Sequence, residues 1–295
     1  MAEAMNDPFD CLIVGAGPAG LTAGIYLGRY LRKVLILHDD KSRAALIPSS
    51  HNFPGFPSGI NGLEFLETLR QQACQYGAQV EVATVTGLTR TQEQFEAQTT
   101  NGGLCARRVI LATGVRDHNP QVPGLEGAIY DGQLRYCPIC DGYEAIDKAI
   151  AVIGPYEHAR KKARFLSTYT RQVTVISPEQ PDAPADPAVS VATGSVSAIE
   201  RDDAITVVLA DGRRLTFDAV YAALGCAPQS QLARSIGAKC DQDGALIVDG
   251  HQKTSVEGLH AIGDVVSCLD QMAVGIGHAA IAATAVHNSL PASPR

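Results

Sequence analysis

The segment Phe9–Gly20, FDCLIVGAGPAG, decides how the fold of this chain begins. Its first half is apolar, as in a buried strand, and Pro18–Arg32 then carries apolar residues at helical spacing. Between them, Gly15, Gly17 and Gly20 have the spacing G-x-G-x-x-G. In such a turn the first glycine allows a tight bend, the second lets a pyrophosphate approach the backbone, and the third lets the helix pack on the strand. The pattern predicts a dinucleotide bound at a helix N-terminus.

A second strand and an acidic residue extend this pattern. Lys33–Leu37 is apolar enough for another buried strand, so strand, helix and strand form a βαβ unit. Asp39 and Asp40 follow, about 20 residues after the glycine turn, where a carboxylate can accept a hydrogen bond from a ribose hydroxyl. The alternative to a dinucleotide site is a glycine-rich turn that binds nothing.

The same build recurs later in the chain. The elements of this second unit are the strand Ala149–Gly154, the helix Glu157–Thr168 and the strand Gln172–Ile176. The interval from Gly15 to Val34 equals the interval from Gly154 to Val173, so the two βαβ units match in register. We therefore expect an α/β protein with two Rossmann-like domains of three layers (ββα), the second inserted in the first.

The expected boundaries follow from turn residues and from the strands between the units. Pro120 and Pro123 indicate a crossing into the second domain, and the chain is expected to return near Asp249. The first domain would then comprise residues 1–117 and 249–295, and the inserted domain residues 118–248.

Composition narrows the function classes. The formal net charge of −7 argues against nucleic-acid binding, which needs clustered basic residues. The N-terminus has no secretory pattern, and the apolar stretch Gln271–Leu290 is interrupted by His278 and His287, so we expect a core helix and no membrane span. These features favour a soluble cytoplasmic protein with mostly reduced cysteines. Five lone cysteines are expected in the core: Cys11, Cys74, Cys105, Cys226 and Cys240.

One cysteine pair stands apart from the others. Cys137-Pro-Ile-Cys140 is the only C-x-x-C in the chain, and next to a βαβ unit this spacing favours a redox dithiol. A zinc site would usually need a second pair, which is absent from the sequence, so we expect no metal; a coincidental reduced pair is the other alternative. Asp141 follows directly and could exchange a proton with the thiolate, or serve only as a turn residue before Gly142.

With these motifs in hand, the chain resembles the low-molecular-weight thioredoxin reductases over nearly its whole length. The motifs that carry the resemblance are GAGPAG (15–20), HNFPGFPSGINGLEF (51–65), LATG (111–114), CPICDGYE (137–144), GLHAIGD (258–264) and DQMAVGIGHAAIAA (270–283). The resemblance implies a homodimer with FAD in the discontinuous domain and a redox pair in the inserted one. The FAD contacts that it implies are Gly15, Gly17, Pro18, Ala19, Gly20, Asn52, Thr113, Gly114, Gly263, Asp264, Gln271 and Met272.

The second glycine turn departs from the pattern of that family. It reads Gly154-Pro-Tyr156-Glu-His-Ala159, so a phenol ring is expected where a pyrophosphate would lie. The family's basic cluster after the next strand is replaced by Ser177-Pro178-Glu179, which should disfavour a 2′-phosphate. Glu179 could instead accept a ribose hydroxyl of NADH or of a second FAD, and Tyr156 could stack on a cofactor ring. Two further departures are the segment Lys41–Pro48 and Asp270, which precedes Gln271.

The sequence thus predicts an FAD-dependent disulfide oxidoreductase that passes electrons between flavin and the Cys137–Cys140 disulfide, and on to a thioredoxin-like protein or a small disulfide. We expect little use of NADPH, with a ferredoxin donor docking on the basic run Arg160–Arg164 as one hypothesis. The alternatives are an NADPH-dependent thioredoxin reductase, a dithiol oxidase that uses oxygen, and a non-enzymic flavin redox sensor.

Overall fold

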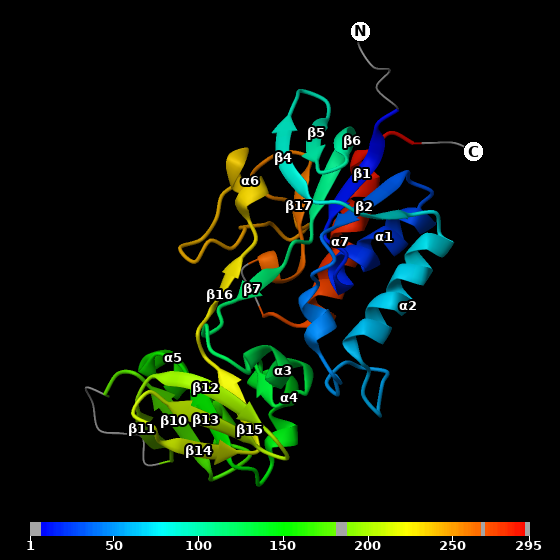
Figure 1. The fold of residues 1–295 in the computed structure, drawn as a ribbon. Helices are drawn as coiled ribbons and strands as arrows, with labels where there is room; N and C mark the ends of the chain where they lie inside the picture. The colour runs from blue at the N-terminus through cyan, green and yellow to red at the C-terminus, as the bar shows by residue number, and fades with distance from the viewer. Residues whose placement is uncertain (1–6, 181–187, 267–268, 293–295) are drawn as a thin grey trace. The chain divides into compact units, whose positions relative to one another are not determined.

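The computed structural model describes residues 7–180, 188–266 and 269–292, which form two compact units (Figure 1). Unit 1 comprises residues 1–45, 62–116 and 227–295, and unit 2 comprises residues 46–61 and 117–226. Each unit is described by itself below. In the described parts of the chain, no helix is both long and apolar enough to cross a bilayer.

Unit 1 is built on a largely parallel sheet. Its elements are β1 (Phe9–Val14), α1 (Pro18–Arg29), β2 (Val34–His38), η1 (Arg43–Leu46, whose last residue belongs to unit 2), α2 (Gly62–Gln75), β3 (Gln79–Val82), β4 (Val85–Arg90), β5 (Phe95–Thr99), β6 (Gly102–Leu111), β7 (Val115–Asp117), α6 (Gln231–Ser235), β17 (Leu259–Ala261), η3 (Gly263–Val265) and α7 (Met272–Ser289). The strand order within the described residues is β3-β2-β1-β6-β5-β4, and β17 also pairs with β6. β1 is parallel to both β2 and β6, whereas β4, β5 and β6 form an antiparallel meander.

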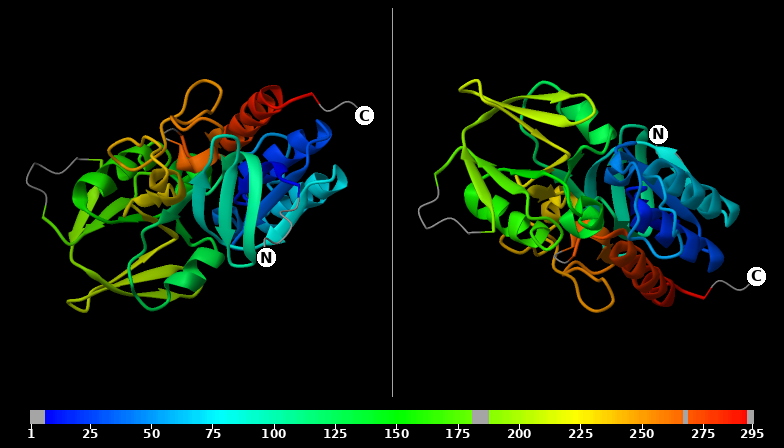
Figure 2. Two further views of the ribbon diagram at one scale, coloured as in Figure 1. Left: turned by 90° about the horizontal axis from the view of Figure 1, so that it is seen from above. Right: turned by 90° about the horizontal axis from the view of Figure 1, so that it is seen from below.

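The two faces of this sheet are covered differently. Leu12, Val14 and Leu35 pack with Leu88 and Phe95 of the meander, together with apolar residues from the segment that contains α6. Helices α1, α2 and α7 form the other layer, in which α1 touches both α2 and α7 (Figure 2). Because β1 and β2 are buried on both faces, their sequences are almost continuously apolar, as the sequence pattern predicted.

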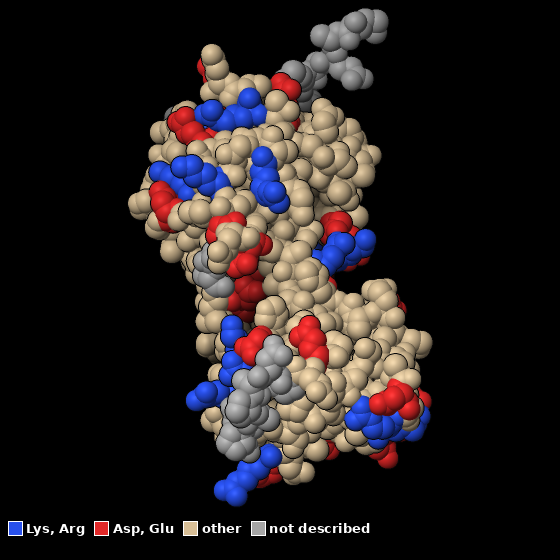
Figure 3. Space-filling view, turned by 90° about the vertical axis from the view of Figure 1, so that its left-hand side faces the viewer, with Lys and Arg blue, Asp and Glu red and all other residues tan. Residues whose placement is uncertain are grey.

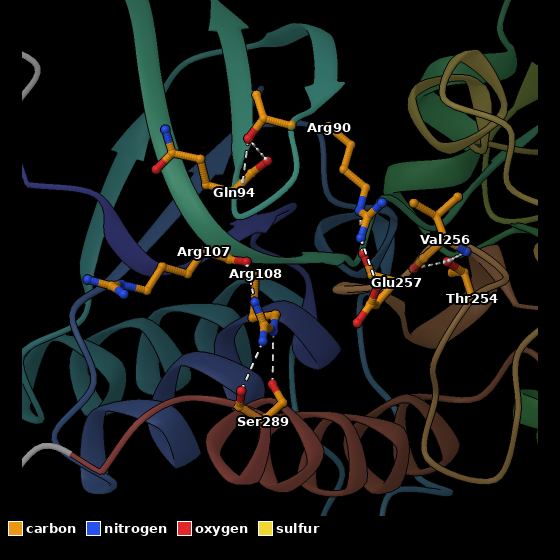
Figure 4. A network of polar contacts seen from close by, with 9 residues as sticks. Arg90, Gln94, Arg107, Arg108, Thr254, Val256, Glu257 and Ser289 are labelled. Carbon is orange, nitrogen blue, oxygen red and sulfur yellow. Dashed lines mark hydrogen bonds and ion pairs between the residues drawn. The ribbon is translucent and has the colours of Figure 1, made fainter.

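Arginine side chains hold the C-terminal end of α7 against the sheet. The guanidinium of Arg108 on β6 donates to the hydroxyl and the carbonyl oxygen of Ser289 (Figure 4). The buried Arg32 donates to the ring and the carbonyl oxygen of His287, and to the carbonyl oxygen of Pro291. In the same view, Arg90 of β4 pairs with Glu257 in the loop before β17.

Unit 2 contains the second βαβ unit. Its elements are α3 (Leu125–Tyr130), β8 (Leu134–Arg135), α4 (Pro138–Asp141), η2 (Tyr143–Ala145), β9 (Ile150–Ile153), α5 (Tyr156–Leu166), β10 (Val173–Ser177), β11 (Ser190–Thr193), β12 (Val196–Arg201), β13 (Ile205–Leu209), β14 (Arg214–Phe217) and β15 (Ala219–Ala222). The strand β16 (Cys226–Pro228) begins at the last residue of unit 2 and continues into unit 1. Among the described residues, a parallel sheet has the order β11-β10-β9-β15-β8. The antiparallel sheet β12-β13-β14 packs on one face through apolar side chains, and α5 packs on the other.

The predicted fold class is confirmed: this is an α/β protein with two Rossmann-like domains of three layers, the second inserted in the first. The expected elements agree with the structure to within a few residues, since β9, α5 and β10 repeat the build of β1, α1 and β2. The division into units differs in two places from the boundaries expected above. Residues 227–248 belong to unit 1, because Ala233, Ala238 and Leu246 lie in its core, and Leu246 also bridges to Val266.

The segment 46–61 also has a different place from the one expected, since it belongs to unit 2. Leu46 packs against the core of unit 2, and Pro48 accepts a hydrogen bond from the Asn61 side chain. The strands β7 and β16, which pair with each other, lie at the two ends of the longer part of unit 2, residues 117–226 (Figure 1).

The lone cysteines do not all lie in the core. Cys11 is fully buried, which raises the pKa of its thiol, and Cys105 and Cys240 are half-buried. Cys74 and Cys226 are exposed, so the expectation of a core position was wrong for these two. Cys74 lies on the solvent face of α2, where helical periodicity alone could have placed it, and Cys226 begins the short β16.

Candidate active site

The glycine turn between β1 and α1 has one position whose side-chain space is open. Gly15 has φ +111°, and a Cβ there would lie 2.3 Å from the carbonyl oxygen of Ala112. A Cβ at Gly20 would lie 1.9 Å from the Gly15 carbonyl oxygen, so both glycines are required by chain packing. A Cβ at Gly17 would meet only the Ser42 hydroxyl, at 3.5 Å. The absence of a side chain at Gly17 therefore leaves space that the protein does not use for its own packing.

This space adjoins the start of α1, and its chemistry fits a dinucleotide. Gly17 is the N-cap of α1 and supplies no side-chain cap, and Pro18 and Ala19 form the first turn. Pro18 has no N–H group, so the N–H groups of Ala19 and Gly20 are the ones available to an anion, with the positive end of the helix dipole behind them. The residues present therefore fit the pyrophosphate of FAD.

Most of the other expected FAD contacts gather around this turn. A Cβ at Gly263 would touch the side chain of Ala19 at 3.2 Å, which places η3 and Asp264 beside the start of α1. Thr113 and Gly114 follow β6, the neighbour of β1, and are fixed by hydrogen bonds to the backbone of Gln229. Gln271 is the N-cap of α7 and Met272 is its first residue.

Three expected contacts have a different setting. Asp39 and Asp40 are exposed and follow β2, so they lie at the same edge of the sheet as the glycine turn, and Asp39 accepts a hydrogen bond from the Lys41 backbone. Asn52 belongs to unit 2, where its side chain accepts a hydrogen bond from Ser50, so it is not part of the group in unit 1.

An arginine that the sequence analysis did not single out lies in this group. The Arg43 guanidinium is 3.4 Å from a carboxylate oxygen of Asp264 and 3.9 Å from one of Asp270. Both departures from the family pattern noted in unit 1, the segment 41–48 and Asp270, thus meet in one ion-pair cluster. A local sequence pattern could not reveal this cluster, because Arg43 lies 221 and 227 positions before the two aspartates. The one signal in the sequence was that the two departures from the family pattern carry opposite charges.

The cysteine pair forms a disulfide at the edge of the sheet in unit 2. Cys137 and Cys140 are bonded, with their Cα atoms 5.3 Å apart. Cys137 follows β8 and caps α4, and its sulfur accepts a hydrogen bond from the backbone N–H of Cys140 at 3.2 Å. A donor aimed at this sulfur stabilises a thiolate there after reduction. The bonded pair and the N–H aimed at its sulfur fit the redox interpretation.

Asp141 carries a perturbed carboxyl beside this disulfide. Burial raises the pKa of Asp141 to about 6, and the nearby charge of Glu144 adds to this effect. The charge of Arg135 and a hydrogen bond from Tyr221 act in the opposite direction. Asp141 therefore changes between its acid and base forms around pH 6, closer to the working range than an ordinary carboxyl, which favours a role in proton transfer.

The second glycine turn is less altered than its sequence suggested. A Cβ at Gly154 would lie 2.5 Å from the Ala223 carbonyl oxygen, so this glycine has the same packing role as Gly15. Tyr156 begins α5 and is only 6% exposed, because its ring packs with Ala159 in the core between α5 and the sheet. The ring is thus not displayed to a ligand, contrary to the expectation that it fills the phosphate position or stacks on a cofactor. Glu179 is exposed just after β10.

The basic run on α5 is not one uniform surface. Arg160 pairs with Glu157, and Lys161 and Arg164 are exposed. Lys162 instead points inward, and its ammonium donates to the carbonyl oxygens of Tyr136 and Ala222 at 2.7 Å each. Because Tyr136 precedes Cys137, this lysine fixes the entrance to the redox turn. Acidic and basic side chains are interspersed on the face drawn in Figure 3.

Replacing Lys162 by methionine should therefore destabilise unit 2. The change leaves two carbonyl oxygens without their charged donor, and we expect a loss of about 1–3 kcal/mol in the free energy of unfolding. Lys161→Met is the matched control, because that side chain is exposed, and it should change stability by less than about 0.5 kcal/mol. Urea denaturation measures both variants, and equal losses would contradict the assigned role of Lys162.

Residues 9–285 match the family described as pyridine nucleotide-disulphide oxidoreductase. The chain is 31% identical over 280 residues to a thioredoxin reductase of Treponema pallidum, covering 88% of this chain and 90% of that protein. The chain belongs to this family. It is also 30% identical over 276 residues to a thioredoxin reductase of Mycolicibacterium smegmatis, covering 87% and 88% of the two chains.

Solved structures agree with this membership of the pyridine nucleotide-disulphide oxidoreductases. The crystal structure of thioredoxin reductase from Streptococcus pyogenes superposes with a TM-score of 0.88 at 26% identity, over 96% of this chain and 98% of that one. The resemblance to thioredoxin reductases is confirmed. This member of the family is a flavin-dependent disulfide oxidoreductase whose redox disulfide is Cys137–Cys140.

Proposed function

We propose that this protein reduces a thioredoxin-type disulfide, with FAD bound in unit 1 and a pyridine nucleotide as the source of electrons. The observation that carries the proposal is that one chain contains both an open turn at Gly17 and a disulfide whose neighbour Asp141 has a pKa of about 6. The family and the relatives reported above support the same function. FAD, when bound, would supply two-electron exchange between the nucleotide and the disulfide.

The residues of unit 1 have the task of holding and orienting FAD. The N–H groups at the start of α1 would bind the pyrophosphate, and the open space at Gly17 would let it approach the backbone. Asp39 or Asp40 would accept a hydrogen bond from the ribose. The other proposed FAD contacts in unit 1 are those that the family resemblance implies.

The residues of unit 2 would carry out the thiol–disulfide exchange and the proton transfer that accompanies it. Reduction of the Cys137–Cys140 disulfide yields a thiolate and a thiol, and Asp141 would carry the proton that enters or leaves at sulfur. The thiolate then attacks a partner disulfide, and the second cysteine resolves the mixed disulfide. Ile139, between the two cysteines, is 49% exposed and would contact the partner. We also propose a homodimer, as the resemblance implies.

The second glycine turn and the end of β10, both in unit 2, bear on which pyridine nucleotide the protein uses. Gly154 retains its packing role and the Tyr156 ring lies in the core, which supports use of a pyridine nucleotide. Glu179 stands at the end of β10, where an adenosine ribose would lie in this fold, and an anion there repels a 2′-phosphate. We therefore expect NADH to reduce the flavin faster than NADPH, by about tenfold or more.

Anaerobic titration of the FAD-loaded protein with each nucleotide, followed by flavin absorbance, measures this preference. Glu179→Arg should shift it toward NADPH, and Gln180→Arg, at the adjacent exposed position, is the matched control. If neither nucleotide reduces the flavin while chemically reduced enzyme still reduces thioredoxin, the donor is a ferredoxin or a second FAD. The ratio of FAD to polypeptide after denaturation then distinguishes those two sources. Oxygen consumption driven by a small dithiol, without nucleotide, would instead favour a dithiol oxidase.

A further inference from the structure

A buried tyrosine hydroxyl points at the carboxyl beside the redox pair. Tyr221 lies on β15, between β9 and β8 in the sheet of unit 2, and its side chain is fully buried. Its hydroxyl is 2.8 Å from Oδ1 of Asp141 and 3.1 Å from the Asp141 carbonyl oxygen. Phenylalanine would fill the same volume in this core, and burying a hydroxyl costs free energy unless it is hydrogen-bonded. The hydroxyl is therefore accounted for by Asp141 and not by packing.

A second side chain reaches the same carboxyl from the neighbouring strand. Nη1 of Arg135, on β8, donates to the Asp141 carbonyl oxygen at 3.2 Å and to the Tyr221 hydroxyl at 3.4 Å. Nε of Arg135 lies 3.9 Å from Oδ2 of Asp141. The two oxygens of the carboxyl thus face different groups, Oδ1 the tyrosine hydroxyl and Oδ2 the guanidinium. Tyr221 and Arg135 thus each contact both the main-chain carbonyl oxygen and the side-chain carboxyl of Asp141.

We propose that Tyr221 and Arg135 are positioning residues that hold Asp141 as the proton carrier of the Cys137–Cys140 pair. The inference rests on the proposed function in one respect only, namely that this pair exchanges with a partner disulfide. It adds to that function two residues whose roles neither the glycine turns nor the C-x-x-C motif indicates.

The proton balance defines what Asp141 has to do. A thiolate of the reduced pair attacks the partner disulfide, one sulfur–sulfur bond forms to the enzyme, and the partner's own disulfide breaks to release a thiolate. The Asp141 carboxyl gives its proton to that leaving thiolate and becomes a carboxylate. The carboxylate then takes the proton of the second enzyme thiol, whose sulfur displaces the partner and restores the Cys137–Cys140 disulfide. Asp141 ends the cycle protonated, as it began.

The groups around Asp141 decide how strongly it holds this proton. Burial and the charge of Glu144 favour the acid form, whereas the donors Tyr221 and Arg135 favour the carboxylate. Burial and the proximity of Asp141 raise the pKa of the Tyr221 phenol, so Tyr221 remains a donor throughout the working range. Removing its hydroxyl leaves burial less opposed, and the pKa of Asp141 should rise above its value of about 6.

Tyr221→Phe tests this inference without requiring a nucleotide. The full-length, FAD-loaded protein is reduced anaerobically with dithiothreitol, desalted and mixed with a small aliphatic disulfide, whose leaving thiolate is basic enough to take a proton from Asp141, and the loss of enzyme thiols is followed against pH. The limb that Asp141→Asn abolishes belongs to Asp141, and in wild type the rate falls along it as pH rises through about 6. In Tyr221→Phe this limb should move to higher pH by about one unit. Arg135→Met should move it in the same direction, and Arg135→Lys, which keeps the charge, should move it less.

Tyr136→Phe is the matched control for loss of a tyrosine hydroxyl. Tyr136 precedes Cys137 and donates its hydroxyl to Asn119 at 2.7 Å, a contact that does not involve Asp141. Its limb should stay at the wild-type position. An unmoved limb in both Tyr221→Phe and Arg135→Met overturns the inference, as does an equal shift in Tyr136→Phe. If wild type itself exchanges no disulfide, the proposed function fails instead, so the two failures are distinguishable. Should Tyr221→Phe fold poorly, the two Arg135 variants decide the outcome.

Discussion

Cys140→Ser is expected to lose disulfide turnover by more than about 10³-fold while its flavin is still reduced by the electron donor. A serine hydroxyl is not ionised at neutral pH and forms no disulfide, so the route from flavin to partner is interrupted after the first step. Cys137→Ser should lose turnover to the same extent, because both sulfurs are needed to form and resolve a mixed disulfide. Steady-state reduction of thioredoxin and stopped-flow reduction of the flavin measure the two steps separately.

The exposed Cys74 provides the control for this experiment. It lies on α2 in unit 1, and Cys74→Ser should leave both steps unchanged. Substantial turnover in both Cys137→Ser and Cys140→Ser would remove the redox pair from the reaction. A cysteine-free alternative, such as direct reaction of reduced flavin with oxygen, would then be the main activity.

Gly20→Ala is expected to disrupt unit 1 as a whole, with a loss of about 3 kcal/mol or more in the free energy of unfolding. Its Cβ would lie 1.9 Å from the Gly15 carbonyl oxygen and 3.1 Å from the Ala112 side chain, so α1 would have to move away from β1. Gly15 directly follows β1 and Ala112 directly follows β6, and the atoms met are backbone atoms and a Cβ, so no flexible side chain can give way. Chemical denaturation and the yield of flavin-bound protein measure this effect.

Gly17→Ala separates cofactor binding from folding. Its Cβ would meet only the Ser42 hydroxyl at 3.5 Å, so the free protein should keep its stability to within about 1 kcal/mol. The added methyl group would occupy the space assigned to the pyrophosphate, and FAD affinity should fall by at least about tenfold. A Gly17→Ala protein that binds FAD as tightly as wild type would contradict the assignment of this turn, whatever the result for Gly20.

The fold could be predicted from sequence because its determinants are local. Strand, glycine turn and helix follow one another within Phe9–Arg32, and the same order recurs from Ala149. The redox pair and Asp141 were likewise contained in one short motif. Residues 227–248 were assigned to the wrong side of the boundary expected for the inserted domain, since the position of Leu246 in the core of unit 1 depends on contacts made far from it in sequence.

The side chains around the site could not be predicted in the same way. Tyr221 has the sequence context of an ordinary core strand, and its direction toward Asp141 depends on which strand lies beside β8. Lys162 belongs to a run that looked solvent-exposed, and its inward direction follows from the helix face that meets the carbonyl of Tyr136. For Tyr156 the substitution was evident, but the direction of its ring was not.

The anchoring of α7 has a consequence for how unit 1 can adjust when it is loaded. Arg32 and Arg108 fasten the last turn of this helix, whereas its first residues, Gln271 and Met272, lie at the opposite end among the proposed FAD contacts. The helix spans 18 residues and packs along α1, so its two ends are joined by one rigid element of about 27 Å. We therefore expect substitution of Arg32 or Arg108 to weaken FAD binding, although both arginines contact the end of α7 that is remote from the proposed FAD contacts.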